Sequence, residues 1–352
     1  MHEASVDSED AAFAAALDDA VSLLPVERVD IANDVDLALD RRPNPPPDLR
    51  TAVDRYLTSR VDPFVLVTVD APTMGVLKAI ASGTSLTEVS QHVERAESLS
   101  SLVRRLAQAG ALGPFGARTD SMPYQLMRLG AGGVRNACLA AAMARAANRA
   151  GPLSALRGQL WRAGLASALT SQALAPAAGV SPDDAWLLGL VHDFGTTAAV
   201  LAVEEFFFSS AGADEFAPLR GANNPYIHRP KADEFMASSG RVADDELTQD
   251  ELVAIAQRHH ADIGWALCAQ WRLPTSITSL TATHHAPKAL TLDEKALIDV
   301  VLRADRLVGT VLAHGKNDVA AIAAMPDRGT TQPEFIVAAL ARYGAWHKVL
   351  RA

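Results

Sequence analysis

The segment GLVHDFGTTAAV, residues 189–200, places a histidine and an aspartate side by side in an otherwise apolar run. Burying an imidazole and a carboxylate among apolar groups is costly unless another group pairs with them. The pair His192–Asp193 therefore predicts a partner supplied from elsewhere: a metal ion, a substrate or another side chain. Taken alone, the pair also fits a hydrogen-bonded core contact that holds two helices in register.

The apolar spacing around this segment is helical. Residues 160–174 (LWRAGLASALTSQAL) and 251–271 (ELVAIAQRHHADIGWALCAQW) repeat apolar side chains at i, i+3 and i+4. β-Branched residues gather only at 64–70 (FVLVTVD), where a short strand is the alternative. The sequence therefore predicts an all-α fold. Four tryptophans on apolar helical faces are expected in the core: Trp161, Trp186, Trp265 and Trp271.

Composition narrows the classes of function. The chain has 352 residues, 49% of them hydrophobic, and a formal net charge of −9, which argues against a broad nucleic-acid or anionic-membrane surface. The first residues, MHEASVDSEDAAF, are acidic where a secretion signal is basic and then apolar. We therefore expect a cytoplasmic protein without a membrane anchor. Its two cysteines, Cys138 and Cys268, are expected to be reduced core thiols.

Breaks in the helical pattern suggest the domain organisation. RRPNPPPD at 41–48 cannot be helical and reads as a stiff linker. Glycine and proline at 112–123 predict a loop, and the polar stretch 209–247 predicts a long surface excursion. The predicted parts are an acidic N-terminal arm with the Pro-rich linker (1–48), an N-terminal helical subdomain (49–123) and a helical bundle (124–352).

The glycines of RLGAGGVRN, residues 128–136, resemble a phosphate-binding loop only superficially. No strand precedes them, and their spacing fits neither the dinucleotide-binding fingerprint nor the P-loop. We interpret them as a site where two helices approach closely.

The histidines suggest a metal site. Four of the ten form two adjacent pairs, His259–His260 and His284–His285, downstream of the His–Asp pair. Neutral imidazole and carboxylate are the ligands expected for Zn, Mn or Fe, and such ligands converge from different helices. His259 points about 100° away from its neighbour around a helix and is expected outside the set. The candidate ligands are His192, Asp193, His260, His284, His285 and Asp305.

The order and spacing of several motifs resemble the HDOD family, signalling relatives of the HD-type metal-dependent phosphohydrolases. The motifs are LLGLVHDFGTTAAVL (187–201), HHADIGWALCAQWRLPTSI (259–277), THHAP (283–287) and LRADRL (302–307). Upstream, residues 85–110 resemble the family's first helical subdomain and 120–143 its connecting segment. The resemblance spans about residues 63–310 and implies an HD-like bundle with a smaller N-terminal helical subdomain.

The resemblance also implies that the site is degenerate. The six candidate ligands match HD-superfamily positions, but Ala163 and Gly164 stand where the first histidine is expected. Thr196 stands where active relatives commonly have a lysine. Because catalytic metals leave little geometric slack, the resemblance implies a non-catalytic signalling or scaffold protein of a bacterial pathway. A divalent cation of open identity is the implied cofactor, and a protein, or a second copy of this chain, the implied partner.

Two alternatives belong to other classes of function. One is a metal-dependent phosphohydrolase acting on nucleotides or cyclic dinucleotides through the same six ligands. The other is DNA binding through a helix-turn-helix at 84–110, with Arg95, Arg104 and Arg105 toward the nucleic acid. The segment lacks a dense basic stripe, so nucleic acid is the less favoured partner.

Overall fold

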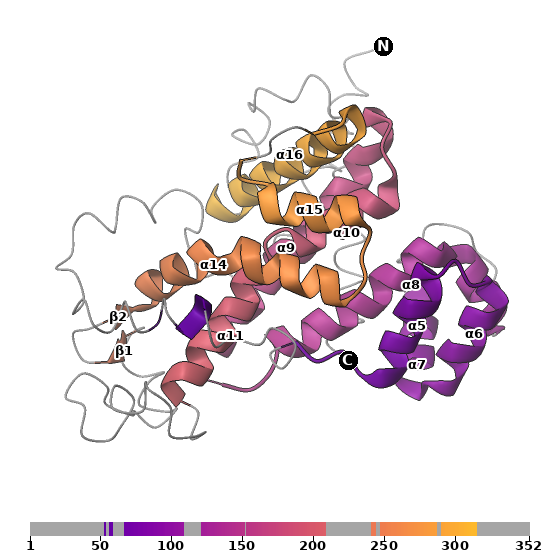
Figure 1. Cartoon of the computed structure of the whole chain (residues 1–352), viewed down its shortest axis with the longest axis horizontal. Coiled ribbons are helices and arrows are strands. Elements are labelled where there is room, and N and C mark those ends of the chain that lie inside the picture. The colour runs from indigo at the N-terminus through magenta and orange to yellow at the C-terminus, as the bar shows by residue number, and fades with distance from the viewer. Residues whose placement is uncertain are drawn as a thin grey trace, which may run out of the picture.

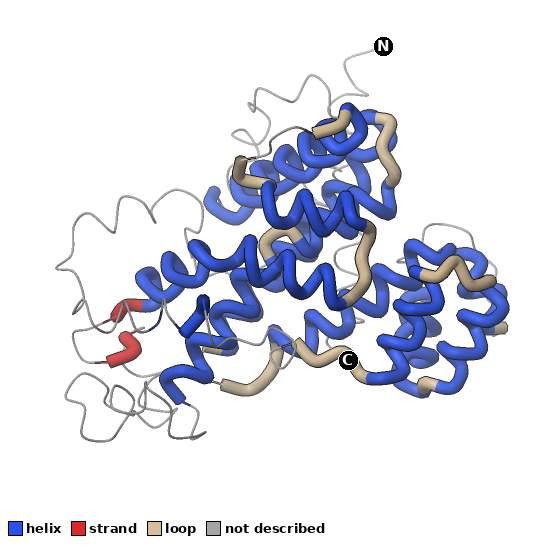
Figure 2. The backbone as a smooth tube through the Cα atoms, viewed as in Figure 1, coloured by secondary structure: helices blue, strands red, loops and turns tan. Residues whose placement is uncertain are grey.

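The structure is a computed structural model, and helices dominate the part of the chain that it describes (Figures 1 and 2). The all-α prediction is therefore confirmed. The only strands among the described residues are β1 (Arg241–Ala243) and β2 (Leu247–Thr248), a short antiparallel pair. The structure describes residues 53, 56–58, 67–108, 121–151, 153–208, 241–243, 247–286 and 290–314. The predicted arm at 1–48 and most of the predicted excursion at 209–247 lie outside these ranges.

Three short helices form an N-terminal lobe: α5 (Ala71–Ala81), α6 (Leu86–Arg95) and α7 (Glu97–Gln108). Helix α5 begins at Asp70, whose Oδ1 accepts the Thr73 N–H at 2.8 Å, and Ser85 caps α6 in the same way. Residues 67–70 belong to neither a helix nor a strand, so the described part of 64–70 does not form the alternative strand.

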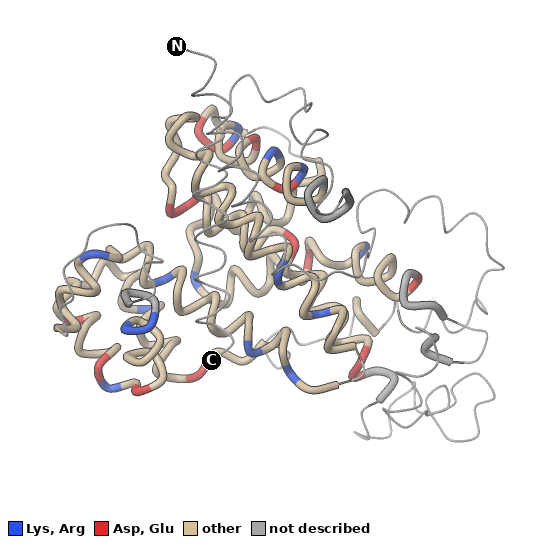
Figure 3. Tube along the Cα trace, turned by 180° about the vertical axis from the view of Figure 1, so that it is seen from behind, with Lys and Arg blue, Asp and Glu red and all other residues tan. Residues whose placement is uncertain are grey.

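The predicted helix-turn-helix corresponds to α6 and α7, which are joined by Ala96 alone. Arg95 and Arg104 are exposed, whereas Arg105 is partly buried. Figure 3 shows acidic and basic positions interspersed along the helices of the lobe and of the bundle. DNA binding through α6 and α7 stays a prediction.

Helix α8 (Met122–Ala147) joins the lobe to the rest of the protein and is kinked at Gly130, where φ is 66° and ψ is 172°. Beyond the kink, Gly132 lies against Asp183, and a Cβ on this glycine would come within 2.8 Å of the Asp183 Cγ. Arg135 pairs with Asp184 at 3.2 Å across the same contact. The close helix–helix approach predicted for the glycine-rich segment is therefore confirmed.

The remaining helices form the bundle: α9 (Ser154–Leu174), α10 (Pro182–Val191), α11 (Phe194–Phe208), α14 (Gln249–Gln270), α15 (Thr275–Thr283) and α16 (Leu292–His314), with the 3₁₀ turn η1 (Ala175–Ala178). Helix α9 packs against α10 and α16, and α11 packs along α14 (Figure 1). Helix α15 follows α14 and packs against it. The ends of α10 and α15, the middle of α14 and the middle of α16 are thereby brought together.

The core of the bundle is built around α10 and α11. Residues 182–205 are apolar and long enough to cross a membrane by composition, with a hydropathy of 1.5, but their most apolar 18-residue window is 94% buried inside the protein. Trp161, Trp186 and Trp271 are buried, as are both cysteine thiols. The prediction for Trp265 is wrong, because its side chain is 50% exposed. Asp262, three residues earlier in α14, is exposed as well.

A buried ion pair holds the start of α9 against α11. The guanidinium of Arg157 pairs through NH1 with Glu204 Oε2 and donates through NH2 to Arg149 O. The other oxygen of Glu204 accepts the Leu153 N–H at 2.9 Å. These contacts hold the segment between α8 and α9 against α11, the helix that begins directly after the His–Asp pair.

Candidate metal centre

The six candidate ligands come together at one place in the bundle, and we call this group the His/Asp cluster. His192 and Asp193 form the tight turn between α10 and α11. His260 lies in α14, His284 and His285 follow α15, and Asp305 lies in α16. His259 is not among the groups close enough to share an ion, as expected for its place around α14. The members are His192, Asp193, His260, His284, His285 and Asp305.

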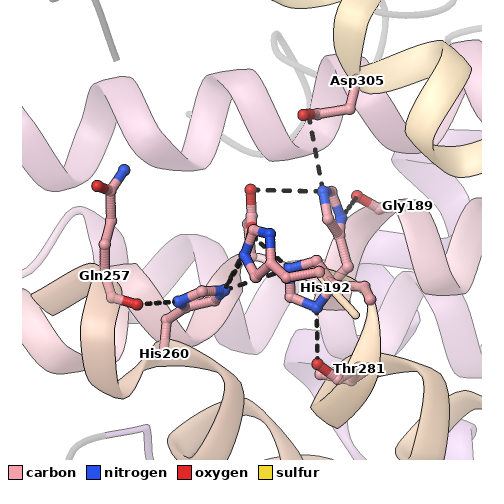
Figure 4. Close-up of polar contacts among 9 residues, drawn as sticks. Gly189, His192, Gln257, His260, Thr281 and Asp305 are labelled. Carbon is pink, nitrogen blue, oxygen red and sulfur yellow. Dashed lines mark hydrogen bonds and ion pairs between the residues drawn. The ribbon is translucent and has the colours of Figure 1, made fainter. Parts of the chain in front are cut away.

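Three of the histidines are held in one orientation. In each, Nδ1 lies within hydrogen-bond distance of a backbone carbonyl three residues earlier, so that Nδ1–H donates and Nε2 faces the cluster (Figure 4). Metal-binding histidines are commonly oriented in this way. The sequence analysis did not identify these acceptors, because they are backbone atoms and carry no signal of their own. They are Gly189 O at 3.0 Å from His192, Thr281 O at 2.8 Å from His284, and Gln257 O beside His260.

The first group of ligand atoms gathers around Asp193 Oδ1. His284 Nε2 lies 3.1 Å and His260 Nε2 3.4 Å from this oxygen. The two nitrogens are 3.2 Å apart, and His285 Nε2 is 3.0 Å from that of His260. Two acceptor nitrogens at such distances repel each other unless a proton or a cation lies between them. Ligands about 2.0–2.2 Å from one ion stand about 3.0–3.5 Å apart, which is the spacing seen here.

The second group uses the other oxygen of the same carboxylate. Asp193 Oδ2 lies 3.4 Å from His192 Nε2, and Asp305 Oδ1 lies 3.6 Å from that nitrogen. His192 Nε2 is buried and makes no hydrogen bond among the described residues. A buried ring nitrogen facing two carboxylates is a position that a proton satisfies in the metal-free protein and that a cation could take over.

The carboxylates control the charge of the cluster. Burial alone would lower the pKa of His192, but Asp193 and Asp305 outweigh it and raise that pKa to about 9. Partial burial opposes ionisation of Asp193 as well, yet His192, with His284 and His260, lowers its pKa. Burial lowers the pKa of His260 and of His285, and the neighbouring imidazoles act in the same direction. These two histidines are therefore neutral at pH 7, the form that binds metal.

The cluster opens to solvent on one side. His192, His260 and His284 are at most 5% exposed, whereas the side chains of Asp193 and Asp305 are each 47% exposed. His285 is exposed as well. The open side of the cluster is therefore formed by the two carboxylates and His285.

The positions expected to complete an active site hold no suitable group. Ala163 and Gly164 lie in α9, and a Cβ on Gly164 would lie 3.8 Å from Leu190 O, close to the end of α10 that leads into the His–Asp turn. Neither residue has a side chain that can bind a metal. Thr196, in the first turn of α11, is 4% exposed and supplies no positive charge.

Comparisons with known proteins agree with this fold. The model of the HDOD domain family matches residues 75–210. Among solved structures, the chain is similar to a candidate metal-dependent phosphohydrolase from Shewanella amazonensis SB2B, with a TM-score of 0.56, 15% identity and coverage of 85% of this chain and 98% of that one. It is also similar to an HDOD domain protein of unknown function from Geobacter sulfurreducens, with a TM-score of 0.53, 20% identity and coverage of 86% and 98%. A comparison with curated proteins gives no match.

Proposed function

We propose that this chain, whose residues 75–210 match the model of the HDOD domain family, is a signalling protein whose His/Asp cluster binds a divalent cation without hydrolysing phosphoesters. The observation that carries the proposal is the convergence of His260 Nε2 and His284 Nε2 on Asp193 Oδ1, at 3.4 and 3.1 Å. Because the Nδ1 atoms of both histidines face backbone carbonyls, their Nε2 lone pairs are committed to the cluster.

The donor set fits a borderline divalent ion such as Zn²⁺, Mn²⁺ or Fe²⁺, because it consists of imidazole nitrogens and carboxylate oxygens. His260, His284, His285 and Asp193 would hold it. When bound, such an ion acts as a Lewis acid toward an oxygen-containing ligand. The exposed side of the cluster, at Asp193 and His285, leaves room for that ligand to enter.

The proposal of a non-catalytic role rests on the positions that the cluster lacks. Ala163 supplies no ligand where a histidine is expected, and Thr196 supplies no cation that could face a phosphate group. Losing one ligand of a catalytic metal site removes most of its rate, because the water and the phosphate oxygens must be held with little slack. A site that binds a cation and an added ligand without turnover suits a sensor or scaffold whose output is a protein contact.

The test combines metal analysis with an activity assay. The full chain, loaded in turn with Mn²⁺, Fe²⁺ and Zn²⁺, is incubated with bis(p-nitrophenyl) phosphate and with cyclic dinucleotides. Asp193→Asn is the matched control, because it keeps the shape of the side chain and removes its charge. We expect metal retention by the wild type only, and no turnover by either protein. Hydrolysis that requires metal and is lost in Asp193→Asn would contradict the non-catalytic role.

One observation favours a second candidate function, a metal-dependent phosphohydrolase. Asp193 directs one oxygen to the group around His284 and the other to His192, so that His192 and Asp305 would be available to hold a second metal ion. The activity assay above separates the two functions: this second candidate requires turnover and the first requires none.

A further inference from the structure

The His/Asp cluster lies where α14 crosses two other helices, and a glycine stands at each contact. Gly195, in the first turn of α11, lies against the backbone of α14 at His260. Gly264, one turn further along α14, lies against the side chain of Thr281 in α15. Each of the two contacts adjoins a residue that carries or anchors a candidate ligand.

The contact at Gly195 leaves no space for a side chain. A Cβ there would overlap His260 O, and would lie 2.7 Å from the carbonyl carbon of His260 and 2.9 Å from Gly264 N. All three are backbone atoms in the middle of a helix, so no change of rotamer relieves the overlap. Helix α14 would have to move away from α11 by on the order of 1 Å to restore normal contact distances. Asp193 precedes Gly195 by two residues, so this movement separates Asp193 from His260.

The contact at Gly264 is less tight and acts on a different ligand. A Cβ on Gly264 would lie 3.0 Å from the Cγ2 methyl of Thr281. The backbone carbonyl of Thr281 accepts the Nδ1–H of His284 at 2.8 Å. A displacement of Thr281 would therefore also move its carbonyl oxygen, which orients the ring of His284.

We propose that Gly195 and Gly264 are positioning residues for the metal centre. By keeping α14 close to α11 and α15, they set the separations among Asp193 Oδ1, His260 Nε2 and His284 Nε2. Coordination distances vary by only about 0.2 Å at a given metal, so a helix displacement on the order of 1 Å takes a ligand out of reach. The inference deepens the proposed function and rests on the cluster binding a cation.

The test is a Co²⁺ titration of the full chain, followed by the visible absorption of the bound ion, which reports ligand geometry. Gly195→Ala is compared with the wild type and with Gly309→Ala in α16, where a Cβ would meet nothing within 4 Å. We expect Gly195→Ala to weaken Co²⁺ binding at least tenfold and to change the spectrum, while Gly309→Ala matches the wild type. Equal affinity and equal spectra for wild type and Gly195→Ala would overturn the inference and leave the proposed function standing.

A second pair of variants decides the matter if Gly195→Ala does not fold. Gly264→Ala should weaken Co²⁺ binding by severalfold, and adding Thr281→Ser should restore it, because serine lacks the Cγ2 methyl and keeps the hydroxyl that donates to Ile277 O. A Gly264→Ala chain that binds Co²⁺ as the wild type does, or one that Thr281→Ser fails to rescue, would overturn the inference.

If the wild type itself binds no Co²⁺, the proposed function fails. The positioning role is then tested by the crystal structure of a metal-free glycine variant. This variant is Gly195→Ala, or Gly264→Ala if Gly195→Ala does not fold. Separation of His260 Nε2 from Asp193 Oδ1 well beyond 3.4 Å in the first, or of His284 Nε2 from Asp193 Oδ1 well beyond 3.1 Å in the second, supports the inference. An unchanged separation overturns it.

Discussion

Replacing Arg157 with methionine should destabilise the protein by about 3–5 kcal/mol, the cost of removing one partner of a buried ion pair. The side chain of Arg157 is fully buried, and that of Glu204 is 7% exposed. Methionine preserves the apolar stem but removes the charge that faces Glu204. The carboxylate keeps the Leu153 N–H at 2.9 Å, and one hydrogen bond does not replace a guanidinium.

The measurement is urea unfolding followed by far-ultraviolet circular dichroism. Arg149→Gln is the matched control, because it removes a neighbouring pair with Glu205 whose side chains are 43% and 30% exposed. Such a partly solvated pair should contribute under about 1 kcal/mol. Adding Glu204→Leu to Arg157→Met should recover part of the loss, since no buried charge then remains. If Arg157→Met costs no more than Arg149→Gln, the reasoning is refuted.

Further predictions concern the pH dependence, the start of α5 and the ranking of two ligands. The folded pKa of His192, about 9, exceeds its ordinary value of 6.5 because two carboxylates outweigh its burial. In the metal-free protein its contribution to stability is thus complete below pH 6.5 and lost as the pH rises through about 9; urea unfolding should show this loss, and His192→Asn should abolish it. Asp70→Ala removes the cap on the Thr73 N–H and should lower the free energy of unfolding by about 0.5–2 kcal/mol, as measured by thermal unfolding. Asp70→Ser should retain most of the stability that the cap contributes, because serine also accepts this hydrogen bond. Zn²⁺ calorimetry should find His284→Ala more damaging than His285→Ala, because His284 is buried and contacts the carboxylate; the reverse order would count against the ligand assignment.

The helical fold could be predicted because its signal is local. Apolar residues at helical spacing mark α9 and α14, and the glycine-rich segment correctly indicated a close approach, seen at Gly132. Trp265 shows where local spacing fails. The apolar face of α14 is broad, and only the direction from which α11 packs decides which of its edges is left in solvent.

The six residues that meet in the His/Asp cluster could also be named from the sequence, because the order and spacing of their motifs resemble those of the HDOD family. What the sequence did not contain is how the ligand atoms are arranged. The split of Asp193 between two groups depends on helix crossings between distant segments. Gly195 illustrates the same limit, since its role is visible only once His260 is known to lie against it.

The most direct test of a cation in the His/Asp cluster is anomalous diffraction from crystals of the full chain grown with Mn²⁺ or Zn²⁺. The proposal predicts an anomalous peak about 2.0–2.5 Å from both Asp193 Oδ1 and His284 Nε2. It also predicts that crystals of Asp193→Asn lack this peak. An empty cluster in wild-type crystals, or a peak of equal height in the variant, would contradict it.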